Sequence, residues 1–204
     1  MIRDYKFDIV LIHMKKVIIL HGTGSSPDSY WHPYLKTKLE ELGHEVQIPR
    51  LPYTDIPKLE EQLPYVLDNY QLDTDTILIG HSSGVPLILG ILEEINTSIC
   101  QTIMVSGFFK ALETNPNSKL ILKKNYNWNR IKKNCKKLII LNSDNDPWGC
   151  DEKMGKELSV LVDEKFIFMK GQGHMGSASY KQPYKEFPLL LDIISSKLLT
   201  SLLR

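Results

Sequence analysis

The sequence has little of what a disulfide-stapled or metal-bound protein needs. Its three cysteines, Cys100, Cys135 and Cys150, are odd in number and form neither a Cys-x-x-Cys pair nor a cluster with histidine. Disulfide frameworks and zinc sites both rest on such groupings. We therefore expect no disulfide framework and no metal site, and a reducing compartment such as the cytoplasm.

An excess of either charge is also missing, because 25 Lys and Arg residues stand against 24 Asp and Glu residues. Attraction to nucleic acid or to an anionic membrane surface needs such an excess. Residues 123–137 form a basic run with interleaved aromatics, but a solvated helix face produces the same pattern more often. We expect a small, roughly neutral substrate and no nucleic-acid partner.

Long apolar runs and internal repeats are absent as well. Charges at Arg3, Asp4, Lys6 and Asp8 interrupt the first residues too often for a secretory signal, and no later stretch is long enough to span a membrane. The first β-rich run follows directly after residue 14, so residues 1–13 are interpreted as an extension that the fold does not need. We expect residues 14–204 to form one domain, a monomer or small homo-oligomer without a membrane partner.

What the sequence does contain is an alternation of short β-rich runs with longer amphipathic stretches. The β-rich runs are apolar almost throughout, as strands buried on both faces of a parallel sheet are. The pattern predicts a three-layer α/β fold in which helices flank a mostly parallel sheet of about six strands. The expected strands are 17–20, 45–48, 76–79, 102–105, 137–141 and 165–169, and the expected helices are about 29–42, 58–70, 83–95, 151–163 and 184–203.

One region, residues 108–136, breaks this alternation. Asn, Lys and aromatic residues dominate it, and no helical or strand period runs through it. We expect it to form a partial cover over the functional site.

The strongest chemical signal is Gly-His-Ser-Ser-Gly at residues 80–84, between an expected strand and an expected helix. A serine on such a sharp strand-to-helix turn is exposed as a nucleophile, and the flanking glycines let neighbouring backbone approach. Ser82 stands at the central position and is the predicted nucleophile. Ser83 is the competitor, and the plainer alternative is a turn in which Ser82 only caps the helix.

A serine hydroxyl needs a base, and histidine titrates in the right range. Of the six histidines only His174 follows Ser82, which is the order Ser, acid, His of α/β-hydrolases. His174 also comes directly after the last expected strand, at the sheet edge where such folds place their sites. It is the predicted base. We expect His21 and His81 to pack or hydrogen-bond locally, and His13, His32 and His44 to be exposed.

The acid that orients the base should follow the strand ending at Leu141, where the sequence offers Asp144 and Asp146. Asp146 is preferred, although an Asp before a proline is also common in ordinary turns. Asp144 remains the alternative.

A Gly-rich turn follows the first expected strand, with Gly22, Thr23 and Gly24 after His21. This fold takes one oxyanion donor from such a turn and another from the residue after the nucleophile. The backbone N–H groups of Thr23 and Ser83 are therefore the predicted oxyanion hole. A phosphate loop is disfavoured because the turn lacks the further glycines or the Gly-Lys-Ser/Thr ending of such loops.

Four segments together resemble the small serine hydrolases typified by retinoblastoma-binding protein nine, a family of the α/β-hydrolase superfamily. They are Ile-Gly-His-Ser-Ser-Gly at 79–84, Asp-Pro at 146–147, Gly-His at 173–174, and Trp-Asn-Arg-Ile-Lys-Lys-Asn-Cys at 128–135. The resemblance extends from about residue 16 to the last expected helix. It implies a Ser-Asp-His triad on a minimal hydrolase core without a large lid.

The chain departs from that family at positions expected to border the substrate pocket. Residues 56–58 read Ile-Pro-Lys where an aromatic residue is usual, and Trp148 begins a Trp-Gly-Cys run in place of an aromatic, an aliphatic and a second proline. Met175 follows the histidine where an aromatic is frequent. The expected pocket residues are His21, Gly22, Gly24, Trp148 and Met175.

These residues predict an enzyme that cleaves an ester of a small acyl substrate through an acyl-enzyme, with no metal or organic cofactor. Thioesters and amides are further possibilities. The alternative from another class is a binding or interaction module that keeps the fold with little turnover, because fold alone does not decide function.

Overall fold

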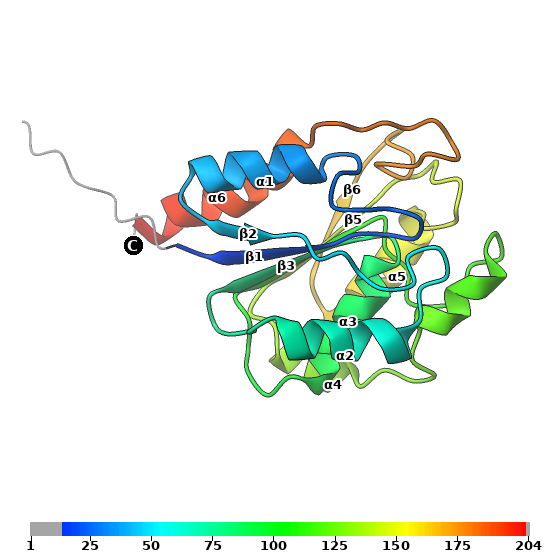
Figure 1. Cartoon of the computed structure of the whole chain (residues 1–204), viewed down its shortest axis with the longest axis horizontal. Coiled ribbons are helices and arrows are strands. Elements are labelled where there is room, and N and C mark those ends of the chain that lie inside the picture. Colours follow the sequence, from blue (N-terminus) through cyan, green and yellow to red (C-terminus); the bar gives the residue numbers. More distant parts are fainter. Residues whose placement is uncertain (1–13, 203–204) are drawn as a thin grey trace, which may run out of the picture.

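The computed structural model describes residues 14–202, with side chains described as far as residue 195. Six parallel strands form one sheet in the order β2-β1-β3-β4-β5-β6, and their carboxyl ends share one edge (Figure 1). The predicted three-layer α/β class is confirmed. The strands are β1 (Lys16–Leu20), β2 (Glu45–Gln47), β3 (Thr76–His81), β4 (Gln101–Val105), β5 (Leu138–Asn142) and β6 (Lys165–Phe168).

Helices cover both faces of this sheet. Helices α1 and α6 lie on one face, and α2, α3, α4 and α5 lie on the other (Figure 1). No helix within residues 14–202 is both long enough and apolar enough to cross a membrane. The elements are α1 (His32–Glu41), α2 (Leu59–Asn69), α3 (Gly84–Glu94), the 3-10 helix η1 (Pro116–Ile121), α4 (Trp128–Lys133), α5 (Glu152–Val162) and α6 (Pro188–Leu202).

Alternate residues of each central strand enter different cores. In β3, Leu78 packs against α2 to α5, whereas Ile77 and Ile79 pack against α1 and α6. This is the two-residue period of a strand, and both sets are apolar because helices cover both faces. Helix α3 is buried from its first residue to Leu92, which matches its nearly uninterrupted apolar sequence.

The strand order reverses between β1 and β3, and this reversal opens the place where a site can form. From β1 the chain moves to β2 at one side, whereas from β3 it moves through β4 and β5 to β6 at the other side. The loops after β1 and β3 therefore diverge and leave a crevice at their carboxyl ends. In register, Leu20 at the end of β1 lies beside Gly80 of β3, so the turns that follow both strands meet there.

The structure differs from the expected elements mainly at their ends. Helix α1 begins at His32 and α6 at Pro188, both later than expected, because proline suits the first helical turn. Helix α2 continues through Pro64, whose side chain is exposed. Strand β6 is only half-buried because it is an edge strand. The predicted extension, residues 1–13, lies outside the described residues.

The segment 128–135 that carried the family resemblance has a structural role. Ile131 is fully buried, and the side-chain amide of Asn134 donates to the carbonyl oxygens of Leu92 and Ile95 at 2.8 and 2.7 Å. These carbonyls lie at the end of α3, where the helix leaves them without backbone partners. Asn134 thus fastens α3 to the chain that enters β5. This explains the motif without a catalytic role.

Two histidines expected at the surface are instead buried, so that expectation was wrong. His32 has no exposed surface and His44 has 5%. His32 Nδ1 is bonded to the Ser26 carbonyl oxygen at 3.0 Å, which makes Nδ1 the protonated nitrogen. Burial lowers the pKa of His32 from 6.5 to about 4.

This burial predicts a loss of stability in mild acid. Between pH 6.5 and 4 the unfolded chain binds a proton at His32 that the folded chain does not, so stability is present above pH 6.5 and falls as the pH falls. His32 alone should lower the free energy of unfolding by about 2 kcal/mol at pH 5 relative to pH 7, or roughly 4–8 °C in melting temperature. His32→Asn keeps a donor for Ser26 and should reduce that difference. An unchanged difference would assign the acid sensitivity to other groups.

Candidate active site

Ser82 sits on the tight turn between β3 and α3 with a backbone φ of +54°, an unusual value for a residue with a side chain. Glycines make this turn possible. A Cβ added at Gly22 would lie 2.8 Å from Ser82 Cβ, and one at Gly84 would collide with the carbonyl oxygen of Leu20. The Gly-His-Ser-Ser-Gly pattern thus brings β1, the serine turn and α3 into close contact.

His174 and Asp146 form a buried pair beside this turn. His174 Nδ1 lies 2.7 Å from Asp146 Oδ2, and their side chains are 5% and 0% exposed. The other carboxylate oxygen, Oδ1, accepts from the Trp148 backbone N–H at 2.8 Å. Because a carboxylate only accepts, Nδ1 carries the proton and Nε2 presents its lone pair. Ser82 and His174 line one cavity without a direct hydrogen bond between them, and such contacts often tighten only with substrate.

Asp144, the alternative acid, makes different contacts. Its side chain accepts from the Gly171 backbone N–H at 2.7 Å, and this hydrogen bond lowers the pKa of the exposed carboxyl. Asn145 accepts from the Gly173 N–H at 2.8 Å, and Ser143 accepts from the N–H of residue 172. Residues 143–145 therefore bind the loop that carries His174, and Asp146 is the carboxylate that meets its ring.

The main chain of His174 is held by three residues that the sequence analysis did not assign to the site. Its carbonyl oxygen accepts from His81 Nε2 and Ser106 Oγ, each at 2.9 Å, and its N–H donates to Gln182 Oε1 at 2.8 Å. Burial is the main cause of a pKa for His81 well below 6.5, so this imidazole stays neutral. His81 was expected to pack or hydrogen-bond locally. Its partner is instead 93 residues away, and no sequence signal connects the two.

The expected oxyanion donors lie side by side. Thr23 Oγ1 donates to Ser83 Oγ at 3.1 Å, which joins the turn after β1 to the start of α3. Within residues 14–195, the backbone N–H of neither Thr23 nor Ser83 has a hydrogen-bond acceptor. Both are available to a ligand oxygen.

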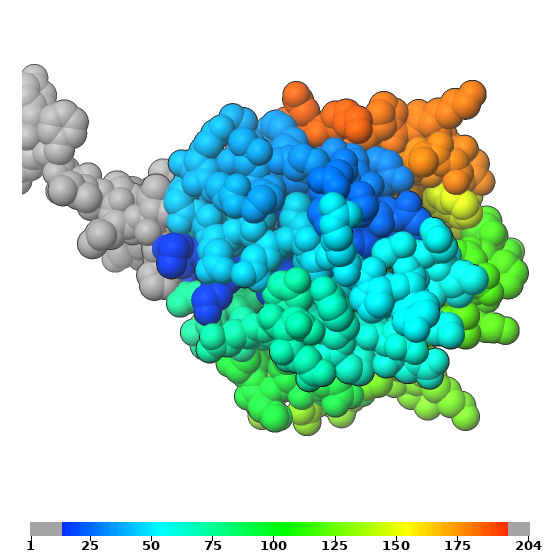
Figure 2. Space-filling model, in the orientation of Figure 1, coloured from blue at the N-terminus to red at the C-terminus, as the bar shows by residue number. Residues whose placement is uncertain are grey.

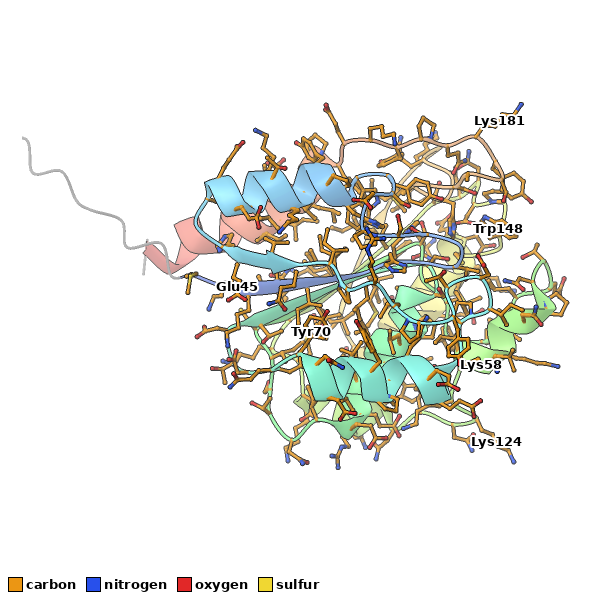
Figure 3. The ribbon with its side chains drawn as sticks, viewed as in Figure 1. Glu45, Lys58, Tyr70, Lys124, Trp148 and Lys181 are labelled. Atoms are coloured by element: carbon orange, nitrogen blue, oxygen red, sulfur yellow. The ribbon has the colours of Figure 1, made fainter. Side chains whose placement is uncertain are left out.

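A cavity of about 200 Å³ opens onto Ser82 and His174. Gly22, Gly24 and Trp148 line it, and Figure 3 shows Trp148 at the end of the molecule opposite Glu45, which begins β2. Other walls come from segments with no chemical motif and include Phe108, Leu112 and Asn115, which lie in the region expected to cover the site. The sequence analysis did not assign Tyr30, Ser177 and Ala178 to the pocket, because nothing in their residue types marks them.

Two expected pocket residues do not reach this cavity. His21 is 2% exposed and its Nε2 accepts from the Leu51 N–H at 3.4 Å. Met175 is fully buried in the core beneath α1 and α6, and its carbonyl oxygen accepts from Trp31 Nε1 at 3.0 Å. His21 directly follows β1, where alternate side chains turn into the core, whereas Met175 lies in the loop after β6 and its side chain packs inward under α1 and α6.

The irregular region 108–136 is divided between two surroundings. Its first part, from Phe108 to Asn115, borders the cavity, in agreement with the expected cover. Its later part, α4, packs against α3 and α5. Residues 128–136 therefore lie away from the cavity.

Asp146, Cys150 and His174 are the three metal-ligating side chains that cluster within the described residues, with ligand atoms within 4.8 Å of one another. Two of these atoms already bond to each other at 2.7 Å. Burial raises the pKa of the Cys150 thiol well above its usual range, so it is protonated. Hydrogen bonding accounts for the Asp146–His174 contact, and the buried Cys150 thiol lies beside that pair.

An all-parallel sheet between two helix layers, with a serine on the turn after its third strand, defines an α/β hydrolase. A model of the serine hydrolase family matches residues 17–193, and the chain belongs to this family. This confirms the resemblance found in the sequence.

Relatives over most of the chain agree with this assignment. The chain is 27% identical to the putative hydrolase YdeN of Bacillus subtilis, over 89% of the chain and 95% of the relative. It is 25% identical to the serine hydrolase RBBP9 of Rattus norvegicus, over 92% and 97%.

Solved structures match in the same way. The crystal structure of YdeN superposes with a TM-score of 0.83 at 28% identity, covering 90% of this chain and 98% of that one. Est1E from Butyrivibrio proteoclasticus, solved with ferulic acid, has a TM-score of 0.69 at 13% identity, covering 93% and 90%. The latter likeness concerns the fold alone.

Proposed function

We propose that this serine hydrolase cleaves an ester bond of a small substrate through an acyl-enzyme, with Ser82 as nucleophile, His174 as base and Asp146 as orienting acid. The observation that carries the proposal is the 2.7 Å His174–Asp146 pair, which turns Nε2 toward the cavity that Ser82 lines. A base oriented by a third group beside a serine is the arrangement that activates a hydroxyl.

In the proposed reaction, Ser82 Oγ bonds to the substrate carbonyl carbon while its proton passes to His174 Nε2. Asp146 stabilises the imidazolium that results. The backbone N–H groups of Thr23 and Ser83 donate to the carbonyl oxygen as it gains negative charge. His174 then returns the proton to the departing alkoxide, and water repeats the sequence on the acyl-enzyme to release the acid and restore Ser82.

The cavity supports esters over peptides. Its polar walls include Thr23, Ser177 and Asn115, and neither edge strand of the described sheet, β2 or β6, contributes a residue to the cavity that could align a peptide. The leaving group of an ester is an alkoxide, which needs less protonation by an acid in order to depart than the amine of an amide does.

A fluorophosphonate probe should label Ser82, because an activated serine attacks phosphorus as it attacks a carbonyl carbon. Labelling is followed by mass spectrometry of the whole protein and of its peptides. Ser82→Ala should abolish the adduct, and Ser83→Ala, which keeps the central serine, should retain it. An adduct on another residue would refute the assignment of the nucleophile.

Turnover separates an enzyme from a binding module with the same fold. A panel of activated esters with acyl chains of increasing length should be hydrolysed by the wild type and not by Ser82→Ala. Short chains should be preferred, because a cavity of about 200 Å³ is little larger than one that holds benzene. Wild-type rates equal to those of Ser82→Ala across the panel would favour the binding module.

A further inference from the structure

The cavity at Ser82 has an uncharged lining. Apart from the histidines of the site, its polar walls are hydroxyl, amide and backbone groups, and its apolar walls include Phe108, Leu112 and Trp148. A charged group placed here would lose its hydration without gaining a partner. The part of the substrate that enters this cavity is therefore neutral.

A more open groove adjoins the cavity and shares Gly24, Tyr30, Ser177 and Ala178 with it. The shared wall is well held, because Tyr30 Oη accepts from the Ala178 N–H at 3.1 Å. In Figure 2 the blue surface of the segment after β1 borders the orange surface of the segment that precedes α6. A substrate longer than the cavity can continue along this border.

The groove, unlike the cavity, is lined by charge, and the unpaired charge is positive. Lys181 and Lys185 line it, and neither forms an ion pair with a carboxylate of residues 14–195. The acidic side chain in the groove, Asp28, is paired with Arg50 at 3.0 Å. The ammonium groups of Lys181 and Lys185 are therefore available to bind a negatively charged group of a ligand.

Hydrogen bonds connect the segment that carries Lys181 to His174 of the active site. Ser177 and Gln182 exchange two backbone hydrogen bonds, of 2.9 and 2.8 Å, and close a tight turn around Lys181. The Gln182 side chain accepts from the His174 N–H. Figure 3 shows Lys181 at the outer edge of the molecule, on the same side as Trp148. One short segment therefore joins the base to the rim of the groove.

From this arrangement we propose that the preferred substrate is an ester with a small neutral acyl group and a leaving group that carries a carboxylate, bound by Lys181 and Lys185. This rests on the proposed function. The acyl group stays on Ser82 in the enclosed cavity after the ester C–O bond breaks. The leaving group takes the proton from His174 and must depart to water, which it can do through the open groove.

The test uses two esters that differ in one charge, 4-acetoxybenzoate and methyl 4-acetoxybenzoate. For each, kcat/KM is divided by the rate of hydroxide-catalysed hydrolysis, which removes the difference in leaving-group reactivity. The wild type should favour the carboxylate by roughly three- to tenfold at low salt, the effect expected of two exposed cations on one anion. The preference should shrink in about 0.5 M NaCl, where exposed charges are screened.

Lys181→Gln/Lys185→Gln should bring the ratio of the two esters close to one. The matched control is Lys132→Gln/Lys133→Gln, which removes the same charge from α4, away from both cavity and groove, and should keep the wild-type ratio. Hydrolysis of both esters with no preference, or a preference that survives the Lys181/Lys185 change, would overturn this inference and leave the hydrolase intact. If the wild type hydrolysed none of the three esters, including 4-nitrophenyl acetate, both this inference and the proposed function would be overturned.

Discussion

Ser82→Ala and His174→Ala should each lower kcat for an activated ester by on the order of 10³-fold or more while the protein stays folded. Without the serine hydroxyl no acyl-enzyme forms, and without the imidazole the hydroxyl keeps its proton. The His174 main chain is held by His81, Ser106 and Gln182 through backbone atoms, so truncating the His174 ring leaves these contacts in place.

The double variant Ser82→Ala/His174→Ala provides the sharper measurement. Residues that act in one step are not additive, so the double variant should be hardly slower than either single variant. Far-ultraviolet circular dichroism and melting temperature establish that each variant is folded. Losses that multiply in the double variant would mean that the two residues act independently, and the shared mechanism would then be wrong.

Asp146→Asn should lower kcat by on the order of 10³-fold with little change in KM, whereas Asp144→Asn should keep most of the turnover. Asp146 Oδ1 accepts from the Trp148 N–H, and an asparagine oxygen would keep this bond. Its NH₂ group would then face His174 Nδ1, which would have to accept. The proton would move to Nε2, the atom that must take the proton from Ser82.

Asp144→Asn should affect the stability of the loop that carries His174 and not the catalytic step. Asp144 holds the Gly171 N–H, and that hydrogen bond favours the charged carboxylate, so neutral asparagine should hold the loop less firmly. The expected result is a lower melting temperature with kcat within a few-fold of the wild type. Turnover and melting temperature are measured for both variants together. If Asp144→Asn loses turnover and Asp146→Asn keeps it, the acid has been assigned to the wrong residue.

The pattern of apolar residues along the sequence determined the fold class without reference to the structure. The apolar runs at 76–79 and 102–105 fitted strands covered on both faces, and the glycines around Ser82 fitted a crowded turn. These are local signals, carried by residues within one turn or one strand, so a single sequence is enough to read them. The order of a serine, a candidate acid and a histidine can also be read from the sequence, although it extends from Ser82 to His174 and not over one element.

Contacts between distant segments were decided by the tertiary structure alone. His81 is hydrogen-bonded to the carbonyl oxygen of His174, 93 residues further along the chain, and Asn145 accepts from the Gly173 N–H. Neither residue type predicts such a partner from the sequence. His32 was expected at the surface because a lone histidine near a helix start does not by itself indicate burial, and only its packing against Trp31 shows that it is enclosed. The cavity wall around Tyr30 and Ser177 was equally invisible. Its residues come from loops without periodicity, and only the common edge of the parallel sheet brings those loops together.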